Sequence, residues 1–136
     1  MPDPAVFGLK EVLELYVKDR EAILQMWSFF SAGTLAVLGF TVGSDKATLS
    51  KAAVRTVQFG YLVFAFGNLV AVVSSQSDYC AVARLVARLA EAQKLTELGT
   101  MYPIPPGLFA IFHIVVTIAV LAAIQITYNS HAKADA

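Results

Sequence analysis

The stretch AILQMWSFFSAGTLAVLGFTVGS, residues 22–44, decides the fold of this chain. It carries no charged side chain and is rich in large apolar and aromatic residues. A helix needs about 20 apolar residues to cross the roughly 30 Å of hydrocarbon in a bilayer, and this run is long enough. A spanning strand is excluded, because its unpaired backbone groups would face lipid and three such segments cannot close a barrel. The stretch therefore predicts a transmembrane helix.

Two further charge-free runs have the same character. Residues 56–77 contain FGYLVFAFGNLVAVV, and residues 107–128 form the apolar core of a longer uncharged run. Both are long enough to span a bilayer as helices. The sequence therefore predicts an all-α integral membrane protein with three transmembrane helices, forming a single membrane domain over residues 1–136.

Composition agrees with this fold class and excludes some functions. Hydrophobic residues make up 57% of the chain and charged residues 15%, whereas soluble domains have about 45–50% and about 25%. Ten basic and ten acidic residues balance to a net charge of zero, so no field of one sign exists to attract nucleic acid. Cys80 is the single cysteine, so no disulfide can form within one chain.

The first two predicted helices extend beyond the membrane. Apolar residues before the first span and after the second recur at the 3-4 spacing of a helix face, without a proline to separate them from the spans. We expect one helix over about residues 4–42 and another over about 48–96, with Ser44 or Thr48 as the cap of the second. The two apolar seams should pair in a helical stalk, and the seam residues are Leu9, Leu13, Tyr16, Val82, Val86 and Leu89.

The third helix is predicted from the prolines that precede it. GTMYPIPPGL contains three prolines, and proline suits the first turn of a helix. We place this helix at about residues 105–128 and expect a polar, frayed tail over 129–136.

The distribution of lysine and arginine predicts the orientation. Three crossings put the N-terminus and the second connection on one face, which carries six of these residues, and the opposite face carries four. The positive-inside rule therefore favours a cytoplasmic N-terminus and stalk, with the C-terminus on the opposite face.

Polar side chains within the spans are the candidate functional residues. Ser31, Asn68 and His113 fall at nearly the same depth when each span is measured from its midpoint, and Thr117 lies one turn beyond. Two interpretations remain open. The layer can provide hydrogen bonds between helices, or it can be a proton, ion or cofactor site with His113 as a ligand to haem or a pigment. Nothing in the sequence requires a cofactor or a metal.

Small residues form a second group of candidates, because glycine lets helix backbones approach closely. Gly39 and Gly43 have GxxxG spacing, and Ala32 with Ala36 extends the pattern. The predicted helix-packing set is Gly33, Gly39, Gly43, Gly60 and Gly67, which can act within the bundle or between subunits.

Enzymatic motifs such as a Walker loop, HExxH or GxSxG are absent from the sequence. The leading hypothesis is a small non-enzymatic membrane subunit that assembles with copies of itself or with other membrane proteins. Two alternatives stay open: a homo-oligomeric ion channel lined by Asn68, His113 or Thr117, and a redox-complex subunit that binds haem or pigment through His113.

Overall fold

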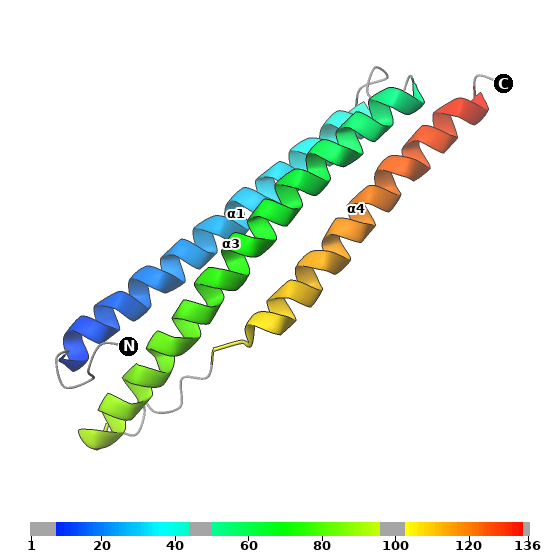
Figure 1. Cartoon of the computed structure of the whole chain (residues 1–136). Coiled ribbons are helices and arrows are strands. Elements are labelled where there is room, and N and C mark those ends of the chain that lie inside the picture. Colours follow the sequence, from blue (N-terminus) through cyan, green and yellow to red (C-terminus); the bar gives the residue numbers. More distant parts are fainter. Residues whose placement is uncertain (1–7, 44–49, 96–102, 135–136) are drawn as a thin grey trace.

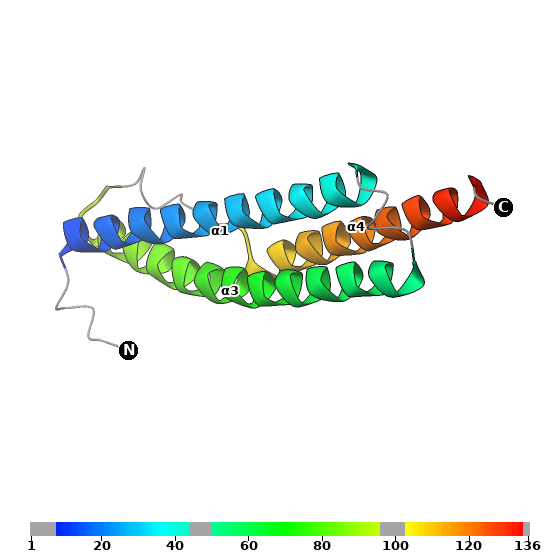
Figure 2. The same cartoon turned by 90° about the horizontal axis from the view of Figure 1, so that it is seen from above.

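A computed structural model of the chain describes residues 8–43, 50–95 and 103–134, and the statements below concern these residues. They form three α-helices: α1 at Leu9–Gly43, α3 at Lys51–Ala92 and α4 at Pro106–Ala134. α1 and α4 run in the same direction, and α3 runs opposite to both (Figure 1). Seen from above, the three helices form a bundle in which α4 lies alongside α1 and α3 (Figure 2).

All three helices are long and apolar enough to cross a membrane. Large side chains also face outward, including Phe59, Phe66 and Ile111, which are 61–70% exposed. An apolar surface of this extent is unusual for a soluble monomer and suits contact with lipid. The structure therefore confirms the prediction of an all-α fold with three helices of membrane-spanning length.

The centre of the bundle is an apolar core to which every helix contributes. α1 supplies Phe30, α3 supplies Tyr61 and Ala65, and α4 supplies Val120 and Ile124. Their spacing places each set on one helix face, which is why three independent apolar runs pack into one core.

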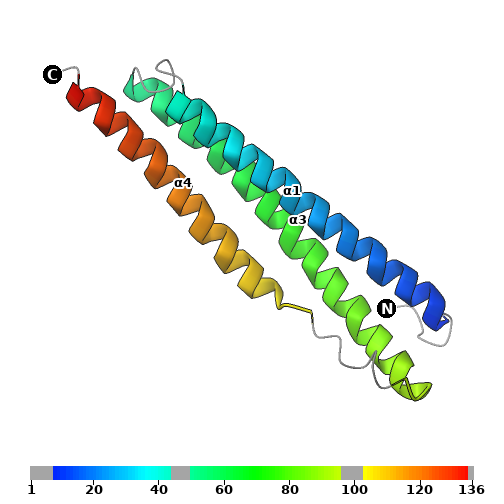
Figure 3. The same ribbon diagram turned by 180° about the vertical axis from the view of Figure 1, so that it is seen from behind.

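α1 and α3 are longer than α4 and continue as a pair beyond the point where α4 begins (Figures 1 and 3). We call residues 9–22 and 78–92 the two-helix extension. Its centre is formed by Val12, Ala83, Val86 and Ala90, all at most 2% exposed. Of the predicted seam residues, Val86 is fully buried, whereas Leu9, Leu13, Tyr16, Val82 and Leu89 are half-buried. They flank a seam whose centre in α1 is Val12.

Helix ends differ from the predicted positions. α3 begins after Ser50, whose hydroxyl oxygen accepts from the Ala53 N–H at 3.1 Å, and Ser44 and Thr48 lie outside the described residues. α3 ends in a Schellman motif, with Leu95 N–H donating to the Ala90 carbonyl and Lys94 at φ 59°. The start predicted near residue 4 also lies outside the described residues.

α4 continues to Ala134 rather than ending at residue 128. The predicted frayed tail over 129–136 was therefore wrong as far as Ala134. Residues 129–134 contain no proline or glycine, and side chains support the extra turns. Ser130 donates to the Ile126 carbonyl and Gln125 donates to Asn129, each at 3.0 Å.

Candidate functional site

Among the His, Lys, Arg, Asp and Glu side chains that the structure describes, His113 alone is buried in the bundle, with 1% of its surface exposed. It projects from α4 towards α3, where its Nε2 lies 3.0 Å from the Ala65 carbonyl oxygen. Because a carbonyl only accepts hydrogen bonds, Nε2 carries the hydrogen, and Nδ1 of the neutral ring is then an acceptor. Nδ1 is buried and has no hydrogen-bond partner among the described residues.

Asn68 provides a second link between helices at a neighbouring level. Its Nδ2 donates from α3 to the Met26 carbonyl of α1 at 3.3 Å. Its Oδ1 is buried without a partner in the described part of the chain. His113 and Asn68 thus join α4 to α3 and α3 to α1, which fits the prediction that polar side chains at this depth can bond across helices.

The other two residues of the predicted polar layer, Ser31 and Thr117, make no described hydrogen bond to another helix. Ser31 lies on the exposed side of α1, one residue beyond the buried Phe30, and so is turned by about 100° from the core. Thr117 donates to the His113 carbonyl within its own helix at 2.9 Å. Ser31 therefore does not meet Asn68 and His113 inside the bundle, because equal depth does not fix the rotation of each helix.

Aromatic rings enclose the imidazole. Phe30 meets it edge to face, with ring centroids 3.9 Å apart, and Trp27 lies at 6.0 Å. One ring nitrogen bonds to Ala65 and the other is covered. An iron or pigment metal needs an open approach to a ring nitrogen, so this arrangement does not fit an axial haem or pigment ligand. Among the described residues, no group of three or more His, Cys, Asp or Glu could hold a metal ion.

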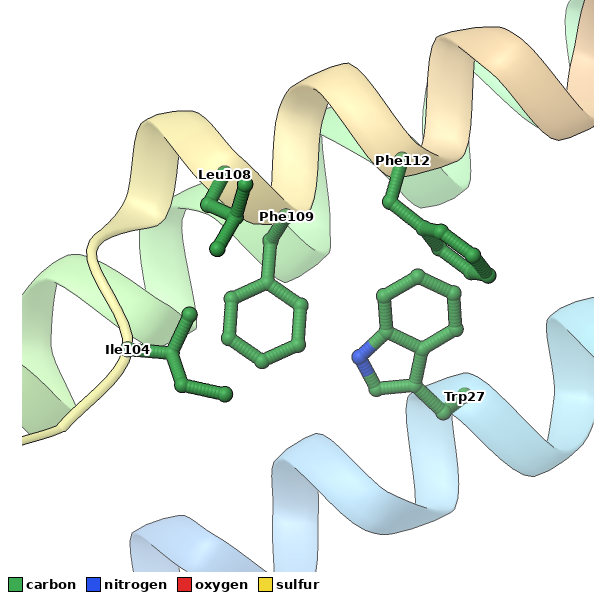
Figure 4. A pocket seen from close by; sticks show the side chains of 5 residues that line it. All are labelled: Trp27, Ile104, Leu108, Phe109 and Phe112. Atoms are coloured by element: carbon green, nitrogen blue, oxygen red, sulfur yellow. The ribbon is translucent and has the colours of Figure 1, made fainter.

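An apolar groove lies beside this centre, between α1 and the start of α4 (Figure 4). Trp27 of α1 forms one wall, and its indole lies 5.6 Å from both the Phe109 and Phe112 rings, between centroids. Leu108 and Ile104 complete the lining, and the cavity measures about 510 Å³. This groove is a candidate binding site that lies beside the buried His113 and Asn68.

Gln76 is a buried polar residue that the sequence analysis did not identify. It is 2% exposed, and its Nε2 donates to the Ile104 carbonyl at 2.8 Å. The Cys80 thiol lies 3.7 Å from the same carbonyl oxygen. These contacts hold the segment that leads into α4 against the middle of α3. A signal was present, because Gln76 follows the buried Val72 by one helical turn and shares its face.

Thr34 and Tyr61 form a second unpredicted polar pair. Their hydroxyl oxygens lie 3.2 Å apart in the core between α1 and α3. Thr34 follows Phe30 by four residues on the buried face of α1, so helical spacing could have identified it.

Only one of the predicted packing glycines makes a close contact between helices. A Cβ atom on Gly33 would lie 2.5 Å from Cζ of Phe64, so a side chain at this position would have to displace the Phe64 ring where α1 and α3 meet. At Gly39, Gly43, Gly60 and Gly67, a Cβ would meet no described atom within 4 Å. These four glycines are exposed and do not pack against any other part of the chain that the structure describes.

Two tyrosines connect the helices of the extension. The Tyr16 and Tyr79 rings stack with centroids 4.8 Å apart, and the Tyr79 hydroxyl donates to that of Tyr16. Burial, with the bond to Tyr16 adding to it, raises the pKa of Tyr79 to about 12. Nearby, burial and the charge of Asp78 raise the pKa of Asp19 above its ordinary value.

Comparison of the chain with protein-family models, with curated proteins and with solved structures finds no match.

Proposed function

We propose that this chain is a small, non-enzymatic integral membrane protein that works as a subunit of an oligomeric membrane complex. The membrane location is supported by three helices of spanning length and by their outward apolar side chains. The Lys and Arg distribution favours a cytoplasmic N-terminus, and the two-helix extension would then project into the cytoplasm.

The outward face of α1 carries the assembly part of the proposal. Gly39 and Gly43 have open space where a Cβ would be, and Ala32 and Ala36 continue the same exposed stripe. At 100° per residue, this stripe lies on the side of α1 opposite the buried Phe30. Small residues on an outward membrane face let a second helix approach closely, which is how membrane helices associate when lipid removes the hydrophobic driving force.

The channel alternative receives less support from the geometry. Asn68, His113 and Thr117 were the predicted pore-lining residues, but their hydrogen bonds are made inside the chain. A pore between subunits would need polar side chains on the outward faces. We therefore prefer assembly through the small-residue stripe of α1.

The test is the mass of the full chain in native lipid, measured for the wild type and for Gly39→Leu. Because Gly39 has no described neighbour within 4 Å, leucine should leave the fold of one chain unchanged and should block the close approach of a partner. We expect an assembly for the wild type and a single chain for Gly39→Leu. Val42→Leu, at an exposed position off the stripe, is the control and should keep the assembly. A wild-type chain that is monomeric and copurifies with nothing would refute the proposal.

A further inference from the structure

The groove between α1 and the start of α4 has the size and lining of a ligand site. Its volume of about 510 Å³ falls within the roughly 300–1,000 Å³ of small-molecule pockets. Three of the five lining residues are more than half exposed, namely Ile104, Leu108 and Phe112. The groove therefore opens to the surroundings of the bundle, which for a membrane protein are lipid.

The surface of the walls is apolar, and one polar group lies covered just behind it. All five lining residues are apolar or aromatic, and only Trp27 has a hydrogen-bonding atom in its side chain. Its Nε1–H is buried and has no partner among the described residues. The nitrogen lies on the side of the indole that faces Phe109 and Ile104 (Figure 4). Tryptophan N–H groups normally find a partner when buried, so an acceptor oxygen is the missing complement.

The start of α4 favours the same chemistry. Leu108 and Phe109 belong to its first turn, and the N-terminus of a helix carries a partial positive charge. Pro105 precedes the helix and has no side-chain oxygen that could cap it. The helix N-terminus therefore disfavours a cation in this groove, even though aromatic rings line it. The apolar walls disfavour any full charge, so an uncharged ligand with an acceptor oxygen is favoured.

The depth of the groove narrows the class of ligand. Ile104 is bonded to Gln76 at the end of the charge-free run of α3, and Asp78 follows two residues later. The groove thus lies where the apolar part of the helices meets the charged part. In a bilayer this is the boundary between acyl chains and headgroups, where the ester groups of glycerolipids lie.

We propose that the groove holds one acyl chain of a bilayer glycerolipid, whose ester carbonyl oxygen accepts the hydrogen bond of Trp27 Nε1–H. The indole nitrogen of Trp27 faces the Phe109 ring (Figure 4), so this ring must turn aside when the ester oxygen binds. This proposal rests on the membrane location in the proposed function and not on assembly. It can be tested on a single chain in a lipid nanodisc.

Trp27 is the only tryptophan of the chain, so its fluorescence reports directly on the groove. Lipids brominated near the ester end of the acyl chain quench a tryptophan that they contact. The matched control is the double variant Trp27→Phe with Phe29→Trp, which moves the reporter to a side chain position that is 62% exposed on α1. We expect quenching of Trp27 to saturate at a low fraction of brominated lipid. Quenching of the control should follow the bulk fraction.

Replacing ester lipids by ether lipids removes the carbonyl acceptor and leaves the protein unchanged. We expect about fivefold more brominated ether lipid to be needed for half-maximal quenching of Trp27, the effect of one neutral hydrogen bond. The control reporter should respond equally to both lipids. Equal responses of Trp27 to ester and ether lipids would overturn the proposal. So would preferential quenching of Trp27 by a short-chain quinone added to ether lipid, which would assign the groove to a different ligand. Neither result would depend on the oligomeric state, which the mass measurement tests separately.

Discussion

The contact between Gln76 and the Ile104 carbonyl makes the strongest single prediction about the bundle. The carbonyl precedes α4, so it lies outside the hydrogen-bond ladder of that helix, and Leu108 N–H bonds to Pro105 instead. Within the described residues, its donors are Gln76 Nε2 at 2.8 Å and the weaker Cys80 thiol at 3.7 Å. Gln76→Leu keeps a similar volume in the core and removes the amide donor, which isolates the polar contribution.

The expected cost follows from leaving the carbonyl without its main donor. A buried polar group that loses its partner costs about 1–3 kcal/mol. Hydrogen bonds between membrane helices average about 0.6 kcal/mol and reach about 1.7, because the separated helices find other partners. The Ile104 carbonyl is not in a helix and would contact water when α4 separates, so the upper part of this range applies. We expect Gln76→Leu to lower the free energy of unfolding by about 1.5 kcal/mol, which is slightly more than tenfold in the equilibrium constant.

The assay is unfolding of the purified chain in mixed micelles by a denaturing detergent, followed by Trp27 fluorescence. A second reading is the rate of disulfide formation on oxidation between the native Cys80 and Ile104→Cys, because the Cys80 sulfur lies 3.7 Å from the Ile104 carbonyl oxygen. Gln76→Leu should slow that reaction. Ser77→Ala is the control, because Ser77 is exposed and, among the described residues, its hydroxyl donates to the Val73 carbonyl of its own helix. A Gln76→Leu variant that unfolds like Ser77→Ala would show that the contact does not hold α4 in place.

Three further outcomes are expected. Tyr16→Phe should lower the pKa of Tyr79 from about 12 towards its ordinary value of 10.0, which phenolate absorbance can measure with Tyr79→Phe as the blank. Because the pKa of Tyr79 is raised in the folded protein, the stabilisation from the tyrosine pair should be present below pH 10. It should be lost as the pH rises through about 12. Lys94→Gly should stabilise the end of α3 by about 0.5–1 kcal/mol, because a φ of 59° is strained for lysine but not for glycine. Hydrogen exchange at the Leu95 amide should then slow. Lys94→Ala is the control and should bring no such gain. Gly33→Leu should destabilise the bundle by about 1–3 kcal/mol through the clash with Phe64, and Gly60→Leu should not; equal unfolding curves for the two variants would contradict the close approach of α1 and α3.

Hydropathy and helical spacing predicted the helices well, because both follow directly from the order of residues. Rotation about each helix axis was harder to predict. Ser31 has the right depth to meet His113 but faces outward, one residue away from the buried Phe30. The glycines show the same limit, because Gly33 packs against Phe64 and Gly39 does not, although both lie in the same span.

Residues at the ends of the apolar runs were also missed for a physical reason. Gln76 lies near the end of a charge-free segment, where a polar residue is expected to face water or headgroups. Its burial depends on a partner nearly thirty residues away, the carbonyl of Ile104, which no local pattern reveals. The groove beside Trp27 has the same origin, because it exists only where α4 starts against α1 (Figure 4).

The shorter length of α4 has a mechanical consequence. Three rods that are packed around a common axis resist bending in every direction. Two rods resist strongly only within the plane that they share and yield more easily across it. The two-helix extension therefore bends more easily than the three-helix part of the bundle to which it is joined (Figure 1). A sideways force on the far end of the extension would concentrate the bending near Gln76, where α4 begins.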